Sequence, residues 1–315
     1  MEKRLFLGVA DNNYSSTAVL GDSEGKIVTT EIGGSVNYQL YGLEQARQNL
    51  KNLLDNLGSC AKPEKLAMAC FTYKSGVVGF QRGFCHLLEG KLAGSKVQLK
   101  EYTAACSLGI PVPKERMLLF GGRTGIVVFD NLAGQRYRLS YNYLSQDLTA
   151  RIEQKREHEG ERSPGMKQLL AAAAQSLQMS KREKFTYLVA EVSALAEQGN
   201  PQALEIAYDI ACDFVRLVCR MAKHMQIKVP TIGLYGQILL GSPVIYERVK
   251  HLLNLLYPAA ELYASPLAPA KGAYLASLLA KKFKINGQRM ANLAVTAKNM
   301  RRKHGLGLNN YDLAK

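Results

Sequence analysis

The sequence predicts a two-domain α/β protein in which a mixed sheet flanked by helices occurs twice. Three strand-like runs joined by turn residues open the chain, and a second set of three begins near residue 115. Each set is followed by alternating helical and strand-like patterns, which is typical of a layered α/β fold. The length of 315 residues also favours two cores over one. We therefore expect an N-terminal domain over 1–113, a C-terminal domain over 114–283 and a basic extension over 284–315.

The first domain is expected to begin with a three-strand meander over 5–9, 16–20 and 26–31. The connection "GDSEGK" between the last two strands has the composition of a tight turn. Apolar residues then recur at helical spacing over 42–57. The pattern continues as strand, helix, strand and short helix: "KLAMAC" at 65–70, residues 75–90, "KVQLK" at 96–100 and "YTAACSLG" at 102–109.

The second domain repeats this order with negligible sequence identity to the first. Its meander is "MLLFGG", "GIVVFD" and "QRYRLSY", and a helical region follows over 143–224. The last helix of that region begins at Asn200-Pro201, an N-cap residue followed by proline at the first helical position. The chain then alternates strand and helix again: "VPTIGLYG", "SPVIYERVKHLLNLLY", "ELYAS" and "APAKGAYLASLLAKKF".

The composition is that of a soluble globular protein with anionic partners. No apolar run approaches the roughly 20 residues needed to cross a bilayer, and the start lacks a signal-peptide core. We therefore expect a cytoplasmic protein without membrane contact. The net charge of +15 suits nucleotides, phosphorylated metabolites or an acidic partner. A homodimer is the expected oligomeric state.

The C-terminal tail carries many of the basic residues. It is either a solvated extension, a segment that docks onto an acidic partner, or one that closes back over the first domain. If the tail acts only by binding a partner, deleting Lys284–Lys315 should remove that binding and leave folding intact. The six scattered cysteines and five scattered histidines form no ligand spacing, so we expect free thiols and no metal site.

Two hairpin tips are the candidate phosphate sites. Each could contact an anion through backbone and side-chain donors, or could be an ordinary turn. The first tip lies in "GVADNNYSSTAVLGDSEGKIV" (8–28), and its candidate residues are Asp11, Asn12, Asn13, Ser15 and Ser16. The second candidate set is Gly121, Gly122, Arg123, Thr124 and Gly125.

These stretches together resemble the BadF/BadG/BcrA/BcrD ATPase and N-acetylglucosamine kinase family, within the actin-like ATPase (ribonuclease H-like) and sugar kinase superfamily. "LFLGVADNNYSSTAVL" resembles the family's phosphate-binding opening, of the form GVDGGGTKTxAVL, and "LLFGGRTGIVVF" lies where its second phosphate loop falls. "PTIGLYGQIL" and "SPLAPAKGAYLASL" resemble its adenosine-side ending. The likeness runs from about Leu5 to Ala280 and implies two actin-like domains with a cleft between them.

The resemblance also implies ligands and roles. ATP with Mg²⁺ would be the cofactor, and a small-molecule sugar would be the second ligand. Both hairpin tips would contact phosphates, and Gly236 with Gln237 would line the adenosine site. Asn37, in "GGSVN", would contact the amino sugar.

The catalytic carboxylates of the family are not matched. The aspartate that organises Mg²⁺ falls on Ala10, and "FTYK" (71–74) stands where the general base should follow a strand. A further aspartate falls near Tyr102. Since phosphoryl transfer depends on positioning and charge neutralisation, we expect a pseudoenzyme that binds nucleotide or sugar or has a regulatory role. The alternative is an active kinase of an N-acetylglucosamine-type sugar, or an ATPase, that uses Asp11 and Glu101.

Overall fold

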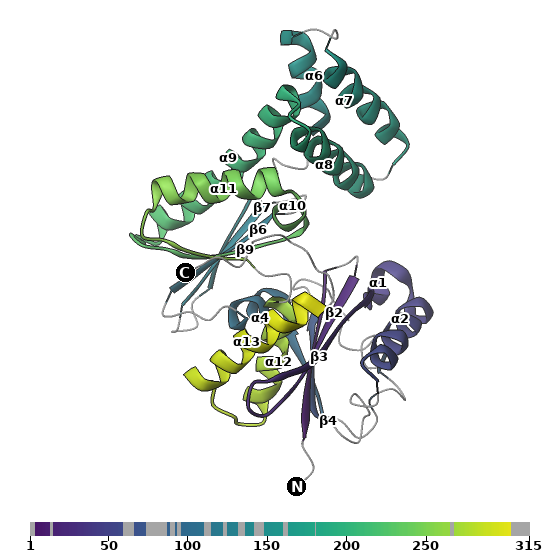
Figure 1. Cartoon of the computed structure of the whole chain (residues 1–315), viewed down its shortest axis with the longest axis vertical. Helices are drawn as coiled ribbons and strands as arrows, with labels where there is room; N and C mark the ends of the chain where they lie inside the picture. Colours follow the sequence, from purple (N-terminus) through teal and green to yellow (C-terminus); the bar gives the residue numbers. More distant parts are fainter. Residues whose placement is uncertain are drawn as a thin grey trace. The chain divides into compact units, whose positions relative to one another are not determined.

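The structure is a computed structural model of the chain, and it folds into two compact units. Unit 1 contains strands β1–β5 with helices α1, α2, α4, α12 and α13, and unit 2 contains the elements from β6 to β10 (Figure 1). The residues that the structure describes are 4–12, 15–58, 66–73, 87–88, 92, 96–109, 115–121, 125–131, 136–141, 148–159, 163–179, 181–264 and 268–303.

The sheet of unit 1 has five strands in the order β3-β2-β1-β4-β5. The first three strands form an antiparallel meander, β4 pairs in parallel with β1, and β5 pairs in parallel with β4. The strands are β1 (Leu5–Asp11), β2 (Ser15–Asp22), β3 (Ile27–Gly34), β4 (Leu66–Tyr73) and β5 (Val97–Glu101).

The sheet of unit 2 repeats that topology, in the order β10-β9-β6-β7-β8. Here too a three-strand antiparallel meander is extended by two parallel strands: β9 pairs with β6, the first strand of the meander, and β10 pairs with β9. This confirms the predicted duplication of mixed sheets. The strands are β6 (Glu115–Gly121), β7 (Gly125–Asn131), β8 (Arg136–Tyr141), β9 (Thr231–Tyr235) and β10 (Glu261–Ala264).

Helices cover both faces of the unit 1 sheet, with α1 and α2 on one side and α12 and α13 on the other (Figure 1). Alternate residues of β1 serve the two faces. Leu5, Leu7 and Val9 pack in the core with α2, whereas Phe6 and Ala10 pack in the core with α12 and α13. The helices are α1 (Tyr38–Tyr41), α2 (Leu43–Asn56), α4 (Tyr102–Leu108), α12 (Ala268–Ala280) and α13 (Gly287–Lys303); most of the helix expected over 75–90 lies outside the described residues.

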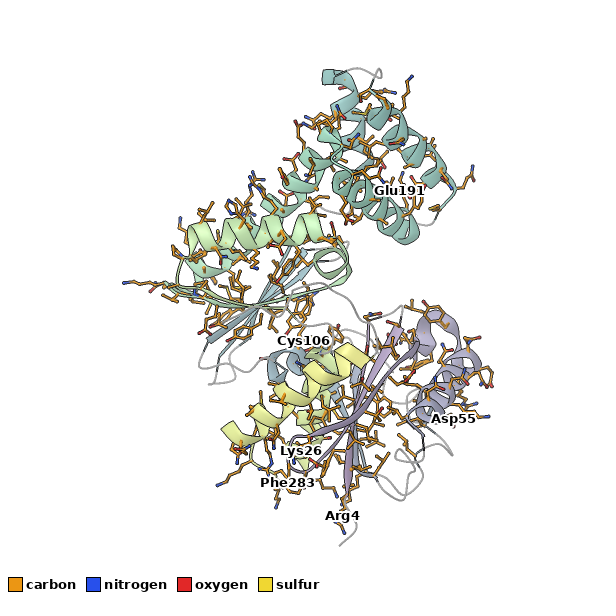
Figure 2. The ribbon with its side chains drawn as sticks, viewed as in Figure 1. Arg4, Lys26, Asp55, Cys106, Glu191 and Phe283 are labelled. Carbon is orange, nitrogen blue, oxygen red and sulfur yellow. The ribbon has the colours of Figure 1, made fainter. Side chains whose placement is uncertain are left out.

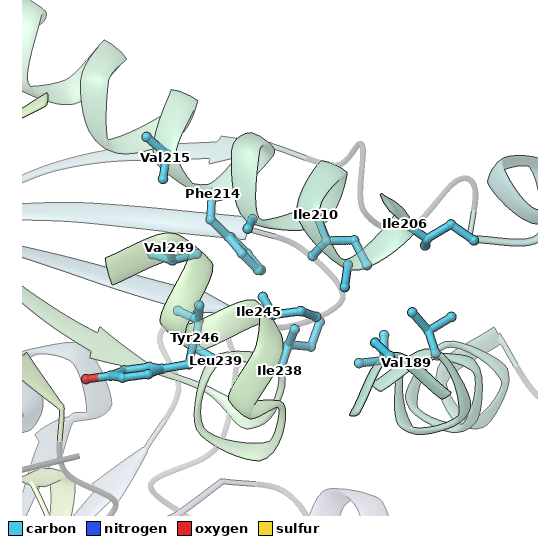
Figure 3. Close-up of a cluster of buried hydrophobic side chains, with 14 of the residues drawn as sticks. Val189, Ile206, Ile210, Phe214, Val215, Ile238, Leu239, Ile245, Tyr246 and Val249 are labelled. Carbon is cyan, nitrogen blue, oxygen red and sulfur yellow. The ribbon is translucent and has the colours of Figure 1, made fainter. Parts of the chain in front are cut away.

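In unit 2, α9 (Pro201–His224) is the central helix. It begins as expected, because the Asn200 side chain accepts a hydrogen bond from the Ala203 amide (2.9 Å) ahead of a proline at the first turn. Its apolar face packs on the sheet and on α10 and α11, where Phe214 meets a buried cluster (Figure 3). The other helices are α6 (Leu148–Glu159), α7 (Pro164–Gln175), α8 (Lys181–Glu197), α10 (Gln237–Gly241) and α11 (Pro243–Leu256), with a 3₁₀ turn at Ser176–Gln178.

The C-terminal boundary differs from the expected division at residue 283, because α12 packs in unit 1. A Cβ at Gly8 would collide with the backbone of Tyr274, and one at Gly272 would collide with the carbonyl of Ala105. The two glycines let α12 pack closely against β1 and α4. Residues 268–280 therefore belong with the first sheet, which the expected C-terminal domain of 114–283 did not anticipate.

Helix α13 is likewise part of unit 1 rather than a solvated tail. Leu293 and Ala297 are buried against the sheet. Arg289 donates from Nε to the Ser23 carbonyl (2.7 Å), and Thr296 accepts at Oγ1 from the Ile27 amide (3.0 Å). Just before the helix, Phe283 (labelled in Figure 2) meets Phe6 edge to face, with ring centroids 5.5 Å apart. Of the three interpretations of the tail, closure over the first domain holds for residues 287–303.

Throughout the described part of the chain, no helix is both long and apolar enough to cross a bilayer. The described cysteines are free: Cys70 and Cys106 are buried, and Cys212 and Cys219 are half-buried.

Candidate functional site

The candidate site in unit 1 lies where its parallel strands end. Asp11 ends β1, Tyr73 ends β4 and Glu101 ends β5, and Tyr73 pairs with Glu101 in the ladder. The carboxyl ends of parallel strands lie at the same edge of a sheet, where ligands of open α/β folds bind. The structure therefore brings both candidate carboxylates, Asp11 and Glu101, to one edge, together with the start of β2 at Ser15.

Asp11 holds the chain segment that precedes α1. Its Oδ2 accepts hydrogen bonds from Ser16 Oγ (2.7 Å), Ser35 Oγ (2.7 Å) and the Val36 amide (2.8 Å). Ser16 Oγ also accepts from the Val36 amide (3.0 Å). The first hairpin and the segment after β3 are thus joined through one carboxylate.

Ala10, at the position of the family's Mg²⁺ aspartate, faces the other side of the sheet. Its side chain is buried in the core that includes Phe6 and Tyr274. Adjacent residues of a strand point to opposite faces, and a slip of one residue reverses the face. Asp11 therefore follows the position that the resemblance assigns to the Mg²⁺ aspartate, and its side chain lies on the opposite face of the sheet.

Asn12 closes the turn between β1 and β2. Its amide donates to the Ser15 carbonyl (3.1 Å), and its Oδ1 accepts from the Ser15 amide (2.9 Å). These are the bonds of a polar hairpin end in which the asparagine side chain satisfies its neighbours. Phosphate contact by Asn12, Ser15 and Ser16 stays a prediction, and Asn13 lies outside the described residues.

Asn37, the predicted sugar contact, is the N-cap of α1. Its Oδ1 accepts from the Gln39 amide (3.1 Å), and its own amide donates to Ser35 Oγ (3.2 Å). Asn49, from α2, donates to the Ser35 carbonyl (2.7 Å). The segment Ser35–Asn37 therefore has a defined conformation, which Asp11 and Asn49 fix from two sides.

No carboxylate ends β4 in the described residues. Thr72 is buried, and its Oγ1 accepts from the Asp11 amide (3.2 Å), which ties the ends of β4 and β1 together. Burial raises the pKa of the Tyr102 phenol well above 10.0, aided by the nearby charges of Cys106 and Asp11. The Tyr102 phenol therefore stays protonated near neutral pH and cannot act as a general base there.

Glu101 has a local structural role as the N-cap of α4. Its Oε2 accepts from the Ala104 amide (3.0 Å) and from Thr103 Oγ1. A side-chain acceptor at this position satisfies an otherwise unpaired amide of the first turn.

The candidate site in unit 2 is a meeting of two glycine turns. Gly121 ends β6 and pairs with Gly125 across the second hairpin, while Gly236 follows β9 with φ +99°. A Cβ at Gly236 would lie 2.8 Å from the carbonyl carbon of Gly121, and one at Gly121 would lie 2.5 Å from Leu239 Cγ. Only glycine fits at both positions without displacement. The predicted second phosphate loop and adenosine-side turn are therefore adjacent within one unit.

Two aromatic side chains pack beside the glycine turns. Phe120 and Tyr235, which precede the two glycines, stack with ring centroids 5.4 Å apart. Gln237 begins α10, although its side chain is not among those described. Gly122, Arg123 and Thr124 lie outside the described residues.

The fit of the two implied cofactors differs. At the glycine turns of unit 2, the space that a Cβ would take is filled by Leu239 and Phe214 at Gly121 and by the Gly121 backbone at Gly236, so contact of a nucleotide with these turns stays a prediction. Mg²⁺ fits less well, because Ala10 supplies no oxygen ligand and Oδ2 of Asp11 already accepts three hydrogen bonds. Among the described residues, no group of three or more acidic, histidine or cysteine side chains could hold a metal ion.

Sequence patterns missed the residues that hold this edge in place. Ser35 and Thr72 lie within quoted stretches, "GGSVN" and "FTYK", but were not among the candidate residues, and Asn49 lies in no quoted motif. One available signal was the pair of polar residues, Asp11 and Ser16, at directly opposite positions of the hairpin.

No protein-family model matches the chain, and no curated protein matches it in sequence. Solved structures match it over most of its length. A candidate N-acetylglucosamine kinase from Chromobacterium violaceum is 13% identical with a TM-score of 0.64, covering 89% of this chain and 100% of that chain. A ROK family glucokinase from Streptomyces griseus, in complex with glucose and AMPPNP, is 12% identical with a TM-score of 0.58, covering 87% and 99%.

A third match, the ethanolamine utilization protein EutJ from Carboxydothermus hydrogenoformans, is 15% identical with a TM-score of 0.54, covering 90% and 91% of the two chains. These likenesses define the fold: the chain has the two-unit fold of actin-like ATPases and sugar kinases. At such low identity they carry no further information on ligand or activity.

Proposed function

We propose that this chain is a nucleotide- and sugar-binding protein of the BadF/N-acetylglucosamine kinase type whose catalytic carboxylates have been lost. Its ligands would be an adenine nucleotide at the glycine turns of unit 2 and an amino sugar of the N-acetylglucosamine type at Asn37 in unit 1. Its role would be binding or regulation rather than turnover. An acidic partner, a homodimer and a cytoplasmic location stay predictions.

The observation that carries this proposal is the burial of Ala10. The residue at the Mg²⁺ position of the resembled family is 5% exposed and packs among apolar side chains. A rotation of the neighbouring Asp11 side chain cannot place an oxygen there, because in the observed register Asp11 lies on the opposite face of the strand. Removing a metal-organising carboxylate costs orders of magnitude in phosphoryl transfer, whereas nucleotide binding depends mainly on backbone contacts.

The support for nucleotide binding is the glycine contact between Gly121 and Gly236. Two turns from separate strands meet there without side chains, at the positions that resemble the family's second phosphate loop and adenosine-side turn. A glucokinase that was solved with AMPPNP and glucose shares the fold, so an adenine nucleotide and a sugar are the ligands to test first.

Calorimetric titration of the purified full chain with ATP and ADP, with and without Mg²⁺, is the direct test. N-acetylglucosamine follows in the same cell, and a coupled assay measures ADP release. We expect nucleotide binding that needs no Mg²⁺, and no turnover with sugar. Mg²⁺-dependent turnover of N-acetylglucosamine would overturn the loss of catalysis and favour the active kinase that uses Asp11 and Glu101. Absence of binding to both nucleotides and the sugar would overturn the proposal as a whole.

A further inference from the structure

Three hydrogen-bond donors from two distant segments converge on one oxygen of Asp11. Ser16 comes from the first hairpin, and Ser35 and Val36 come from the segment between β3 and α1. Both serines are almost completely buried, at 0% and 2% exposed. Buried hydroxyl and amide groups need partners, and a carboxylate is the strongest acceptor a protein can offer them.

Uncharged contacts also hold the segment. Helix α1, which follows it, has four residues and none of them is buried. Gly33 and Gly34 precede it, so the backbone there is intrinsically mobile in the unfolded chain. The Val36 side chain packs in the core with α2, and Asn49 holds the Ser35 carbonyl. The Asp11 carboxylate is therefore the only described charged group that ties this segment to the first hairpin.

The position of Asn37 depends on the Asp11 carboxylate through two consecutive hydrogen bonds. Its amide donates to Ser35 Oγ (3.2 Å), and Ser35 Oγ in turn donates to Asp11 Oδ2 (2.7 Å). Loss of the acceptor would weaken the hold on Ser35 and Val36 together, because both lose a hydrogen bond to the same atom. The Asn37 side chain would keep its bond to the Gln39 amide, but the backbone that carries it would be held less firmly.

We propose that Asp11 is a positioning residue, whose carboxylate holds Ser35–Asn37 against the β1–β2 hairpin and so sets the conformation of the sugar-binding segment. The part of this inference that concerns sugar rests on the function proposed above. The part that concerns the segment does not, since it follows from the hydrogen bonds alone. Asp11 thus stands where the resembled family has a glycine and performs a task that the family's phosphate hairpin does not need.

Hydrogen exchange tests the segment without any ligand. In the full-length chain, Asp11→Ala should speed exchange of the Val36 amide by about 10-fold, since this amide loses its hydrogen bond to Asp11 Oδ2 and keeps only the one to Ser16 Oγ. Asp11→Asn keeps a carbonyl oxygen at the same place and should retain most of the protection from hydrogen exchange. Asp55→Ala, an exposed carboxylate on α2 (labelled in Figure 2), is the matched control and should change nothing. Unchanged exchange in Asp11→Ala would overturn the inference.

Titration with N-acetylglucosamine tests the consequence for binding. We expect Asp11→Ala to weaken sugar affinity by about 10-fold and ATP affinity by less than about 2-fold, with Asp11→Asn close to the wild type in both. Should Asp11→Ala fail to fold, Ser35→Ala removes one donor and should change exchange and affinity in the same direction. If the wild type turns over and Asp11→Asn is as inactive as Asp11→Ala, the carboxylate acts on metal or substrate and positioning is overturned. If the wild type binds no sugar, the proposed function fails while the exchange result still decides the role of Asp11.

Discussion

The backbone of Gly8 in β1 lies against the backbone of Tyr274 in α12, so closely that a Cβ at position 8 would lie 2.7 Å from the Tyr274 Cα. The two residues come from opposite ends of the chain, yet they share the core of unit 1. This contact fixes α12 on the first sheet. It also makes the glycine a requirement of packing rather than of turn geometry.

Gly8→Ala should therefore destabilise the protein by about 3 kcal/mol, because the new methyl group meets backbone that cannot rotate away. Chemical denaturation of the full chain measures this change. Gly287→Ala is the control in the same unit, since a Cβ there meets nothing within 4 Å. It should be neutral or slightly stabilising, by less than about 1 kcal/mol. Equal effects of the two substitutions would mean that α12 does not pack on β1 as described.

The docking of α13 makes a separate prediction about the C-terminal segment. Leu293 is 2% exposed and packs on unit 1, whereas Val295 is 62% exposed on the same helix. Leu293→Ala should lower the free energy of unfolding by about 2–4 kcal/mol, and Val295→Ala by less than about 0.5 kcal/mol. Thermal or urea denaturation distinguishes the two. A Leu293→Ala variant as stable as the wild type would restore the expectation that the tail can be deleted without loss of folding.

Local patterns were sufficient for much of the fold. Strand runs, the Asn200-Pro201 helix start and the two meanders each depend on residues close together in the sequence, and the structure has them where they were expected. The sheet against which α12 packs was not predictable in this way. Its close contacts with Gly8 and Ala105 join residues more than 160 positions apart, and no periodicity records such a contact.

The same limit applied to the candidate site. The sequence identified Asp11, Asn37 and the glycine turns as candidates, and the structure places Gly121 beside Gly236. The role of Asp11 toward Ser35 and Val36 depends on how the chain returns after β3 to the end of β1. If the register of β1 were shifted by one residue, the Asp11 side chain would lie on the other face of the sheet and would have different partners. Its role therefore depends on the three-dimensional structure.

Because of Tyr274, the free energy of unfolding should decrease at alkaline pH. Its buried hydroxyl donates to the Asp22 carbonyl (2.5 Å), and burial, followed by the charge of Asp22, raises its pKa above the ordinary value of 10.0. Below pH 10 the phenol is protonated in both states, and Tyr274→Phe should cost about 1–2 kcal/mol for the lost hydrogen bond.

Above pH 10 the unfolded phenol ionises while the folded one stays protonated, so the unfolded wild type is favoured. The stability advantage of the wild type over Tyr274→Phe should therefore shrink as pH rises through and beyond 10. Urea denaturation of both proteins, below and above pH 10, gives the difference between their free energies of unfolding. The contributions of other titrating groups cancel in this difference. A difference that stays constant with pH would show that burial does not keep this phenol protonated.

Gly236 offers the sharpest test of the nucleotide site. Gly236 and Gly199 both have positive φ, +99° and +82°, so alanine strains the backbone by about 1–2 kcal/mol at either position. They differ in their surroundings, because a Cβ at Gly199 meets nothing within 4 Å while one at Gly236 meets the backbone of Gly121. Gly236→Ala should therefore push the two glycine turns apart and weaken ATP binding by about 10-fold or more, measured by calorimetry. Gly199→Ala should lose stability through the strain alone and keep the wild-type affinity. Equal affinities in the two variants would show that the meeting of Gly121 and Gly236 serves packing in unit 2 and not a nucleotide.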